Sequence, residues 1–380
     1  MQPGKELPAP SLIKTAESLL TKTFGGPVRL VRADNLGGNS RSNVYRFVVL
    51  DGSSKAPKSV IVKQAQGAYA SMLFNDWASL QFLQQLIPLA PRFYAGDSDS
   101  ALLIMEDLGT GKRLDQLLLG DDPVAAEQAL IDFATVHGRM HALSIGKASE
   151  YARIREALGP TIETDDYASS RLAANLRQIT TALSIPPAQG IDAELSTLAT
   201  SLQNPGPFLA FIQGDSCPDN VIYTNSGMYM LDFEGGCFTH ALLEGCYGHI
   251  PFPTCWCVYR LPEHIPPRME VAYRTELIQG CPAANDALLF QHTLVDACVY
   301  WALAFRPLAS LSTLLQNDNA FVALSDRQRY LLIFNNVARL TEEANHLEAV
   351  GTALRLIAGK LANLWPLAIN PPYYPAFNFL

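Results

Sequence analysis

The chain has 380 residues, of which 48% are hydrophobic and 17% charged, a composition typical of folded globular proteins that argues against a disordered chain. Its net charge is −8, and the acidity lies in residues 109–380, which carry 17 basic and 27 acidic side chains, whereas residues 1–108 carry 11 and 9. Nucleic-acid binding needs basic stripes, so this distribution argues against it and permits a cationic small substrate, although acidic surfaces also serve solubility.

The first third of the chain reads as a small sheet with two helices. Apolar residues recur at helical spacing over 11–24 and again over 71–86, and the run from Gly25 to Pro27 stops the first helix. Short apolar or alternating runs bounded by turn residues predict strands. These strands are expected at 28–32, 44–50, 59–64 and 101–106.

Beyond Gly109 the pattern becomes mainly helical. The exceptions are an apolar run at 208–212 and a predicted hairpin of 221–223 with 228–231. Strands followed by helices is the order of an α+β protein. At this length we expect two lobes, a small antiparallel-sheet N-lobe at 1–108 and a larger, mainly helical C-lobe at 109–380.

A run of small and polar residues follows the first predicted strand. Gly37 and Gly38 begin it, and Asn39 and Ser40 continue it toward Asn43. A turn without bulky side chains lets backbone N–H groups approach phosphate oxygens, so Gly38, Asn39 and Ser40 are candidate nucleotide contacts. On its own, a Gly-Gly pair more often marks a plain hairpin turn.

Lys63 ends an apolar strand, where its charge is costly unless it is paired. A phosphate and a carboxylate from the following helix would pair it, and Asp76 is the candidate carboxylate. The alternative is a lysine that extends into solvent from the strand end. Farther along, Glu106 to Leu108 leave the last strand of this region, where their backbone groups would contact an adenine edge or simply form an acidic turn between the lobes.

Three further polar side chains lie among apolar strands. Asp215 and Asn220 follow the run at 208–212, and Asp232 ends the predicted hairpin, which returns it to the neighbourhood of Asn220. A single Asp in a loop is usually a cap or turn former. Phosphoryl transfer, however, needs one Asp to orient a substrate hydroxyl, and an Asn and a second Asp to hold Mg²⁺ against ATP phosphates. We therefore predict Asp215 as catalytic and Asn220 and Asp232 as metal ligands.

The motifs that follow one another along the chain are Leu36-Gly37-Gly38, Asn43-Val44-Tyr45, Val62-Lys63, Leu103 to Gly109, Gly214-Asp215, Asn220 and Asp232-Phe233-Glu234. In this order they resemble the aminoglycoside phosphotransferase family, in the protein-kinase-like superfamily that also includes the choline kinases. The resemblance implies a two-lobed protein-kinase-like fold with a nucleotide-binding N-lobe. It also implies that Lys63 and Asp76 serve the nucleotide site, that Asp215 is catalytic, and that the backbone of Glu106 and Leu108 contacts adenine.

The chain departs from the family pattern at three positions. Gln213 stands where the family usually has a largely architectural His. Asp76 replaces the usual Glu partner of the lysine and is one methylene shorter, so the ion pair needs a closer helix or bound ATP. Glu244 stands where many members have a further Asp. His137 and His141 match a family helix that often ends in Leu-His-Ala, and we expect them to be structural.

All seven cysteines lie in the second half of the chain, and their odd number in a large chain predicts reduced thiols in the cytoplasm. No secretory signal and no uninterrupted apolar run long enough for a bilayer is apparent. Cys and His residues recur between 237 and 257, which suggests zinc, but their spacing fits no well-known zinc framework. We favour an interpretation in which Cys255 and Cys257 alternate on an apolar strand and His240 and His249 lie in loops.

The sequence as a whole predicts an ATP- and Mg²⁺-dependent phosphotransferase acting on a hydroxyl of a small molecule, such as an aminoglycoside-like compound, an amino alcohol or another metabolite. Nucleic acid and membranes are not expected partners.

Two alternative functions stay open. A nucleotide-binding pseudokinase that regulates a partner is disfavoured because all the expected catalytic and ligand residues are present, but Gln213 and Asp76 keep it open. The second alternative is an enzyme of the same fold that transfers a nucleotidyl group.

Overall fold

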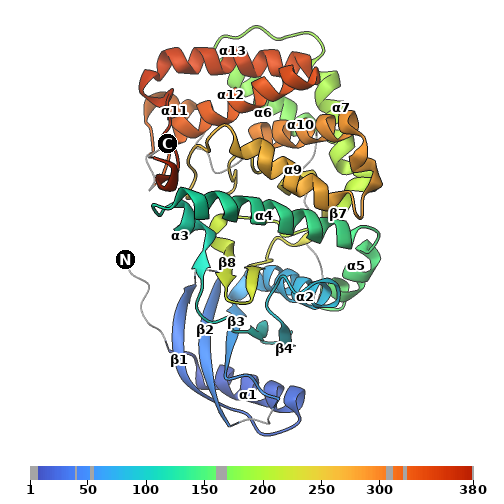
Figure 1. Cartoon of the computed structure of the whole chain (residues 1–380), viewed down its shortest axis with the longest axis vertical. Helices are drawn as coiled ribbons and strands as arrows, with labels where there is room; N and C mark the ends of the chain where they lie inside the picture. The colour runs from blue at the N-terminus through green and yellow to red at the C-terminus, as the bar shows by residue number, and fades with distance from the viewer. Residues whose placement is uncertain are drawn as a thin grey trace.

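The computed structural model describes residues 7–38, 41–51, 55–159, 169–304, 311–319 and 323–378. Two lobes follow one another along the long axis of the molecule, a blue sheet with its helices at one end and a bundle of helices at the other (Figure 1). This is the two-lobed α+β fold that the sequence predicts. The boundary at residue 108 stays a prediction.

The N-lobe is built on a five-stranded antiparallel sheet in the order β1-β2-β3-β5-β4. Its strands are β1 (Arg29–Gly38), β2 (Ser42–Asp51), β3 (Ser59–Ala65), β4 (Phe93–Asp97) and β5 (Leu102–Glu106). The edge strand β4 was not predicted. The prediction for the first strand was too short, because β1 continues through Gly37 and Gly38, which pair with Val44 and Asn43 after a register shift.

Two helices cover the sheet, α1 (Pro10–Phe24) and α2 (Ala70–Leu86). Side chains alternate across a strand, so neighbouring residues of β3 serve different faces. Val60 and Val62 belong to the core that includes α1. Ile61 and Lys63 instead line a cavity together with Asp76 of α2. The alternation of β3 therefore buries one face and turns the other toward the junction of the lobes.

The C-lobe consists of helices that surround an apolar core. They are α3 (Leu114–Leu118), α4 (Pro123–Ser144), α5 (Ala148–Glu156), α6 (Ser169–Ala182), α7 (Ile191–Gln203), α8 (Leu242–Gly245), α9 (Ile265–Leu277), α10 (Ala287–Ala304), α11 (Leu311–Gln316), α12 (Asp326–Ala344) and α13 (Glu348–Leu364). α4 crosses the lobe near the junction, and α12 and α13 lie at the far end (Figure 1).

α10 is the one helix in the described part of the chain that is long and apolar enough to cross a membrane by length and composition. Its surroundings explain its apolarity, because 61% of the helix is buried and it packs against α8 and α12. A helix that is hydrophobic on all sides is expected at the centre of a large core. α10 occupies that place in the C-lobe.

Short strands cross the C-lobe close to the junction. They are β6 (Lys112–Arg113), β7 (Leu209–Ile212), β8 (Val221–Thr224), β9 (Gly227–Met230) and β10 (Cys237–His240). β8 and β9 form the predicted hairpin, and β7 pairs with β10. The loop from β7 to β8 carries Asp215 and Asn220, and Asp232 follows β9. The predicted strand with Cys255 and Cys257 is absent, and His240 lies on β10 and not in a loop.

The expectation of reduced thiols throughout is wrong for two cysteines. Cys217 and Cys255 form a disulfide, with their Cα atoms 5.4 Å apart. The free cysteines are the exposed Cys237 and the buried Cys246, Cys257, Cys281 and Cys298. The count of cysteines gave no sign of this pair, because its formation depends on two loops that the tertiary structure brings together.

Candidate active site

A cavity of about 510 Å³ lies between the lobes, within the range of roughly 300–1,000 Å³ that is usual for small-ligand sites. The predicted site residues that line it are Lys63, Asp76, Glu106, Leu108, Asn220 and Asp232. Of the glycine turn, Gly37 and Ser42 line the cavity, whereas Asn39 and Ser40 lie outside the described residues. The structure thus brings together residues that are far apart in sequence, such as Lys63 and Asp232, which are 169 positions apart and in contact.

Lys63 is the centre of an ion cluster. Its side chain is buried, and its ammonium Nζ lies 2.9 Å from Asp76 Oδ2, 2.7 Å from Asp232 Oδ1 and 2.9 Å from Glu234 Oε1. The predicted ion pair of Lys63 with Asp76 is therefore present in the structure. Burial alone would lower the pKa of Lys63, but the three carboxylates raise it above its ordinary value. The ammonium stays charged, and the cluster carries more negative than positive charge.

Asp76 reaches Lys63 because α2 is fastened to the loop after β9. The second carboxylate oxygen of Asp76 accepts a hydrogen bond from the backbone N–H of Phe233 at 3.2 Å. One residue earlier in the helix, the side-chain amide of Asn75 donates to the backbone carbonyl of Glu234 at 2.9 Å. The Glu234 side chain then completes the cluster on Lys63. These bonds bring the helix close enough for an aspartate, where the family usually has the longer Glu.

Asp232 occupies an uncommon backbone conformation. Its φ is 59°, in the left-handed region that few non-glycine residues adopt and that Asp tolerates better than most. Strain of this kind is often found at functional sites, where surrounding contacts hold it. Here the neighbouring contacts are the bond from Leu231 N–H to the Asn220 carbonyl and that from Phe233 N–H to Asp76. The conformation presents the half-exposed carboxylate of Asp232 to the cavity.

Asp215 lies beside Asn220. The Asn220 side-chain amide donates to the Asp215 carbonyl at 2.9 Å and to its carboxylate at 3.3 Å. Since Nδ2 makes these bonds, the amide oxygen of Asn220 is left for another partner. Burial, followed by the nearby charge of Asp232, raises the pKa of Asp215 to about 6, against bonds from Thr254 and Asn220 that lower it. Asp215 is a carboxylate at neutral pH and a stronger base than an ordinary Asp.

The segment that joins the lobes is held by a buried carboxylate. Asp107 accepts two hydrogen bonds of 2.8 Å from the guanidinium of Arg46, on β2, and one of 3.0 Å from the Gly109 backbone N–H. Burial would raise the pKa of Asp107, but these bonds lower it overall. Glu106 and Leu108, on either side, line the cavity. Sequence reasoning did not identify Arg46 as the residue that fixes this segment.

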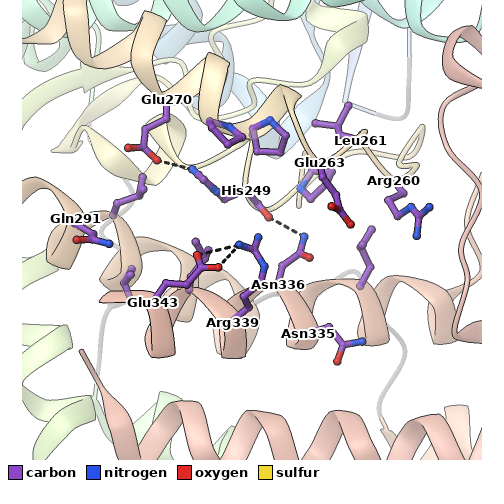
Figure 2. Close-up of a pocket in the computed structure, with 18 of the residues that line it drawn as sticks. His249, Arg260, Leu261, Glu263, Glu270, Gln291, Asn335, Asn336, Arg339 and Glu343 are labelled. Carbon is purple, nitrogen blue, oxygen red and sulfur yellow. Dashed lines mark hydrogen bonds and ion pairs between the residues drawn. The ribbon is translucent and has the colours of Figure 1, made fainter. Parts of the chain in front are cut away.

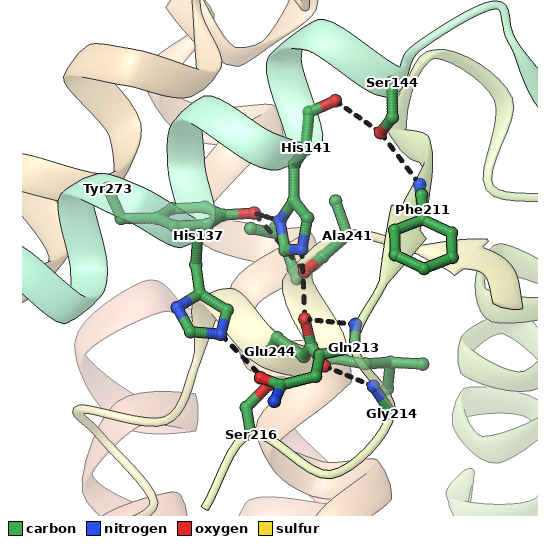
Figure 3. A network of polar contacts seen from close by, with 12 residues as sticks. His137, His141, Ser144, Phe211, Gln213, Gly214, Ser216, Ala241, Glu244 and Tyr273 are labelled. Atoms are coloured by element: carbon green, nitrogen blue, oxygen red, sulfur yellow. Dashed lines mark hydrogen bonds and ion pairs between the residues drawn. The ribbon is translucent and has the colours of Figure 1, made fainter. Parts of the chain in front are cut away.

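Behind the cavity, a buried polar network holds the loop that carries Asp215 (Figure 3). Glu244, in α8, accepts hydrogen bonds from the backbone N–H groups of Gln213 and Gly214 at 3.2 and 2.7 Å. Its carboxylate also lies 3.1 Å from Nε2 of His141, whose Nδ1 lies 2.8 Å from the Tyr273 hydroxyl. Burial would raise the pKa of Glu244, but His141 and the neighbouring groups lower it to about 2.

The Gln213 side chain has a structural role at the position where the family usually has His. It is fully buried, and its side-chain amide donates to the backbone carbonyl of Leu231, directly before Asp232. His137 and His141 are also fully buried in this region, and Nε2 of His137 lies 3.1 Å from the Ser216 hydroxyl. Gln213 therefore links the Asp215 loop to the Asp232 loop.

The disulfide of Cys217 with Cys255 joins the Asp215 loop to the segment 246–257. Cys217 Sγ lies 3.2 Å from Asp215 Oδ1, and Thr254 lies within 3.5 Å of the same sulfur. The Cys and His residues that suggested zinc are dispersed, since His240 stacks on Phe208 and His249 binds Glu270. Among the described residues, no group of three or more His, Cys, Asp or Glu side chains is placed to hold a metal by itself.

Residues 36–245 match the family model described as the phosphotransferase enzyme family, and this span exceeds half of the chain. The chain belongs to this family. The match includes every predicted site residue, from Gly38 to Asp232. No curated protein sequence matches the chain.

Solved structures similar to this phosphotransferase include three small-molecule kinases. A choline kinase from Streptococcus pneumoniae is 13% identical, with 86% of this chain and 98% of that chain covered and a TM-score of 0.45. An ethanolamine kinase from Plasmodium vivax is 9% identical over 80% and 82%, with a TM-score of 0.44. A macrolide 2'-phosphotransferase from Brachybacterium faecium is 13% identical over 77% and 98%, with a TM-score of 0.38. At these identities they identify no substrate, and family membership rests on the sequence match.

Proposed function

We propose that this phosphotransferase moves the γ-phosphate of ATP, bound with Mg²⁺, to a hydroxyl group of a small molecule. The observation that carries the proposal is the cluster on Lys63, in which three carboxylates face one ammonium at the wall of the interlobe cavity. Asn220 lines the same cavity and contacts Asp215. The site therefore combines a cation for phosphate, oxygen donors for a metal and a base.

The donor set fits Mg²⁺, which prefers oxygen ligands and is usually bound through one or two carboxylates and substrate phosphates, without an all-protein cage. Asp232 supplies a carboxylate at the cavity, and the amide of Asn220 keeps its oxygen free because its nitrogen bonds Asp215. When bound there, Mg²⁺ would neutralise charge on the β- and γ-phosphates. Lys63 would contact the triphosphate, and Glu106 and Leu108 the adenine.

Asp215 is the proposed base. It orients the acceptor hydroxyl and takes up its proton as the oxygen bonds to the γ-phosphorus, while the bond between that phosphorus and ADP breaks. A pKa of about 6 suits this role, because the carboxylate is ionised at neutral pH yet binds a proton more readily than an ordinary Asp. Asn220 and Thr254 hold the carboxylate in place by hydrogen bonds.

The acceptor class is a small hydroxyl compound, and the acidic C-lobe favours one that carries positive charge. Aminoglycosides, amino alcohols and uncharged polyols form a suitable panel. The test incubates each compound with the purified protein, ATP and Mg²⁺, and measures ADP release together with the mass of the product. We expect ADP and a monophosphorylated acceptor for at least one compound.

Asp215→Asn should abolish this turnover and leave ATP binding largely intact, whereas Asp192→Asn, at an exposed ion pair with Arg177, should behave as the wild type. Release of AMP or pyrophosphate would show nucleotidyl transfer and overturn the proposal. ATP binding without turnover of any compound, by wild type and variant alike, would instead indicate the pseudokinase. Equal loss of ATP affinity and rate in Asp215→Asn would contradict the role of that residue as base.

A further inference from the structure

A second cavity, of about 770 Å³, lies within the C-lobe among α9, α10 and α12 (Figure 2). Within the described part of the chain it shares no lining residue with the interlobe cavity. α9 packs on the side of α4 that faces away from the N-lobe, so the second cavity lies beyond α4 from the nucleotide cleft. It is therefore a separate site, and its walls are both charged and apolar.

At one end of this cavity the charges are already paired (Figure 2). Nε2 of His249 lies 2.8 Å from Glu270, and Arg339 binds Glu343 at 2.8 Å. The carbonyl of His249 also accepts a hydrogen bond of 3.0 Å from the Asn336 side chain. These contacts hold the wall at this end of the cavity in place.

At the other end, Arg260 and the exposed Glu263 both line the cavity, and neither forms an ion pair or side-chain hydrogen bond with any residue in the described ranges. The guanidinium of Arg260 stacks on Tyr373, 3.9 Å from the ring centre, which holds it in position, and its Nε is buried without a partner. A buried donor without a partner destabilises the fold unless a ligand or a water molecule accepts its hydrogen bond. Opposite charges at one cavity, held apart from each other, are suited to a ligand that carries both.

A third group points to a ligand as well. The His249 side chain is 7% exposed, and its Nδ1 has no hydrogen-bond partner among the described residues. The lining of the cavity also has an apolar part, which includes Leu261, Leu294 and Leu332. A ligand that fills the space thus needs a carboxylate, an ammonium and an apolar body.

We propose that this cavity binds an α-amino acid with an apolar side chain. Its carboxylate would accept hydrogen bonds from the planar guanidinium of Arg260, a geometry in which arginine is favoured over lysine. Its ammonium would pair with Glu263, and its side chain would lie against the leucines. The inference concerns a site outside the nucleotide cleft and does not depend on phosphoryl transfer.

The test measures binding to the whole purified protein by calorimetry, without nucleotide, for leucine, methionine and phenylalanine. The matched probes are the methyl ester and the N-acetyl form of each, which lose the anionic and the cationic group respectively. We expect at least one free amino acid to bind and both of its derivatives to bind about tenfold more weakly or worse, as loss of a charge-assisted hydrogen bond predicts. Arg260→Gln and Glu263→Gln should each weaken binding by a similar factor.

Arg268→Gln is the control variant, because Arg268 lies on α9 and pairs with Glu127 outside the cavity. It should leave amino-acid binding unchanged. Absence of binding by all three amino acids would overturn the proposal. So would an ester or N-acetyl form that binds as tightly as the free amino acid, or binding that survives both Arg260→Gln and Glu263→Gln in variants whose unfolding temperature matches that of the wild type.

Discussion

The charged cluster on Lys63 and the polar network on Glu244 lie on opposite sides of the Asp215 loop, and they balance charge in different ways. On Lys63, one ammonium faces three carboxylates, and the Asp232 side chain is 40% exposed at the cavity. On Glu244, one carboxylate accepts from two backbone N–H groups and lies beside His141, with side chains that are 2% exposed or less.

The difference indicates that the Lys63 cluster is suited to binding a ligand, whereas the Glu244 network supports the Asp215 loop. Excess negative charge at an open cavity is stabilised by a divalent cation, so the Lys63 cluster suits the metal site that we propose. The Glu244 network is complete, because each carboxylate oxygen has a donor within the fold. Substitutions in the Lys63 cluster should lower activity with little effect on stability. Substitutions in the Glu244 network should mainly lower stability.

The largest effect is expected for Glu244→Gln. The amide would place an N–H₂ group against the backbone donors of Gln213 and Gly214, and it would remove the charge beside His141. Breaking a buried, hydrogen-bonded charge of this kind costs about 3–5 kcal/mol. The free energy of unfolding in urea measures it. Glu276→Gln, at the exposed pair with Arg139, should cost no more than about 1 kcal/mol, and an equal loss in the two variants would contradict the assignment.

Asp232→Asn is expected to lower turnover on the order of 10²–10³-fold, the range for loss of one electrostatic group in an active site. Its stability should be unchanged or slightly raised, since Lys63 keeps Asp76 and Glu234 and one carboxylate repulsion disappears. Turnover as a function of Mg²⁺ concentration, together with urea unfolding, checks both statements. Destabilisation as large as that of Glu244→Gln would remove the contrast between the two regions.

The disulfide provides an intermediate effect. It closes a loop of 38 positions between Cys217 and Cys255, and a cross-link of this kind typically contributes about 2–4 kcal/mol to stability. Cys255→Ser should lower the urea midpoint by a corresponding amount, and a reductant should have no further effect on that variant. Cys237→Ser, at an exposed free thiol, is the control. Mass spectrometry that finds the Cys217 and Cys255 thiols free under non-reducing conditions would disprove the cross-link.

Much of the site was predictable because the relevant residues sit at ends of regular elements. Lys63 ends an apolar strand, and Asp215, Asn220 and Asp232 are spaced by a strand and a hairpin whose periodicity is clear in the sequence. The pairing of Lys63 with Asp76 followed from the cost of a charge at a buried strand end. The catalytic and ligand roles of these residues remain predictions.

What the sequence did not reveal depends on contacts between distant loops. Glu234 was part of the recognised motif, but only the fold shows that its carboxylate reaches Lys63. Arg46 looks like one more polar residue on an alternating strand, although it holds Asp107 sixty-one positions away. The strand expected around Cys255 does not form in the structure. Prolines and a disulfide shape that segment, and tertiary packing there overrides the preference that apolar alternation indicates.

Acidification should lower the free energy of unfolding in two steps, one from His240 on β10 and one from Glu244. The pKa of His240 is lowered to about 4, first by burial and then by His141, so between about pH 6.5 and 4 the unfolded state binds a proton that the folded state excludes. The pKa of Glu244 is about 2, so its contribution is present above about pH 4.5 and is lost toward pH 2. Stability therefore falls with falling pH in both windows, by up to about 1.4 kcal/mol per pH unit for each group.

Urea unfolding of the wild type and of His240→Asn at pH 7, 6 and 5 separates the first step from the second. Asn keeps an oxygen that can accept from the Leu242 backbone N–H, as Nδ1 of His240 does at 3.2 Å, but it does not titrate. The slope of stability against pH should therefore be smaller in His240→Asn, whatever its stability at pH 7. An unchanged slope in His240→Asn would mean that another group causes the loss of stability between pH 7 and 5.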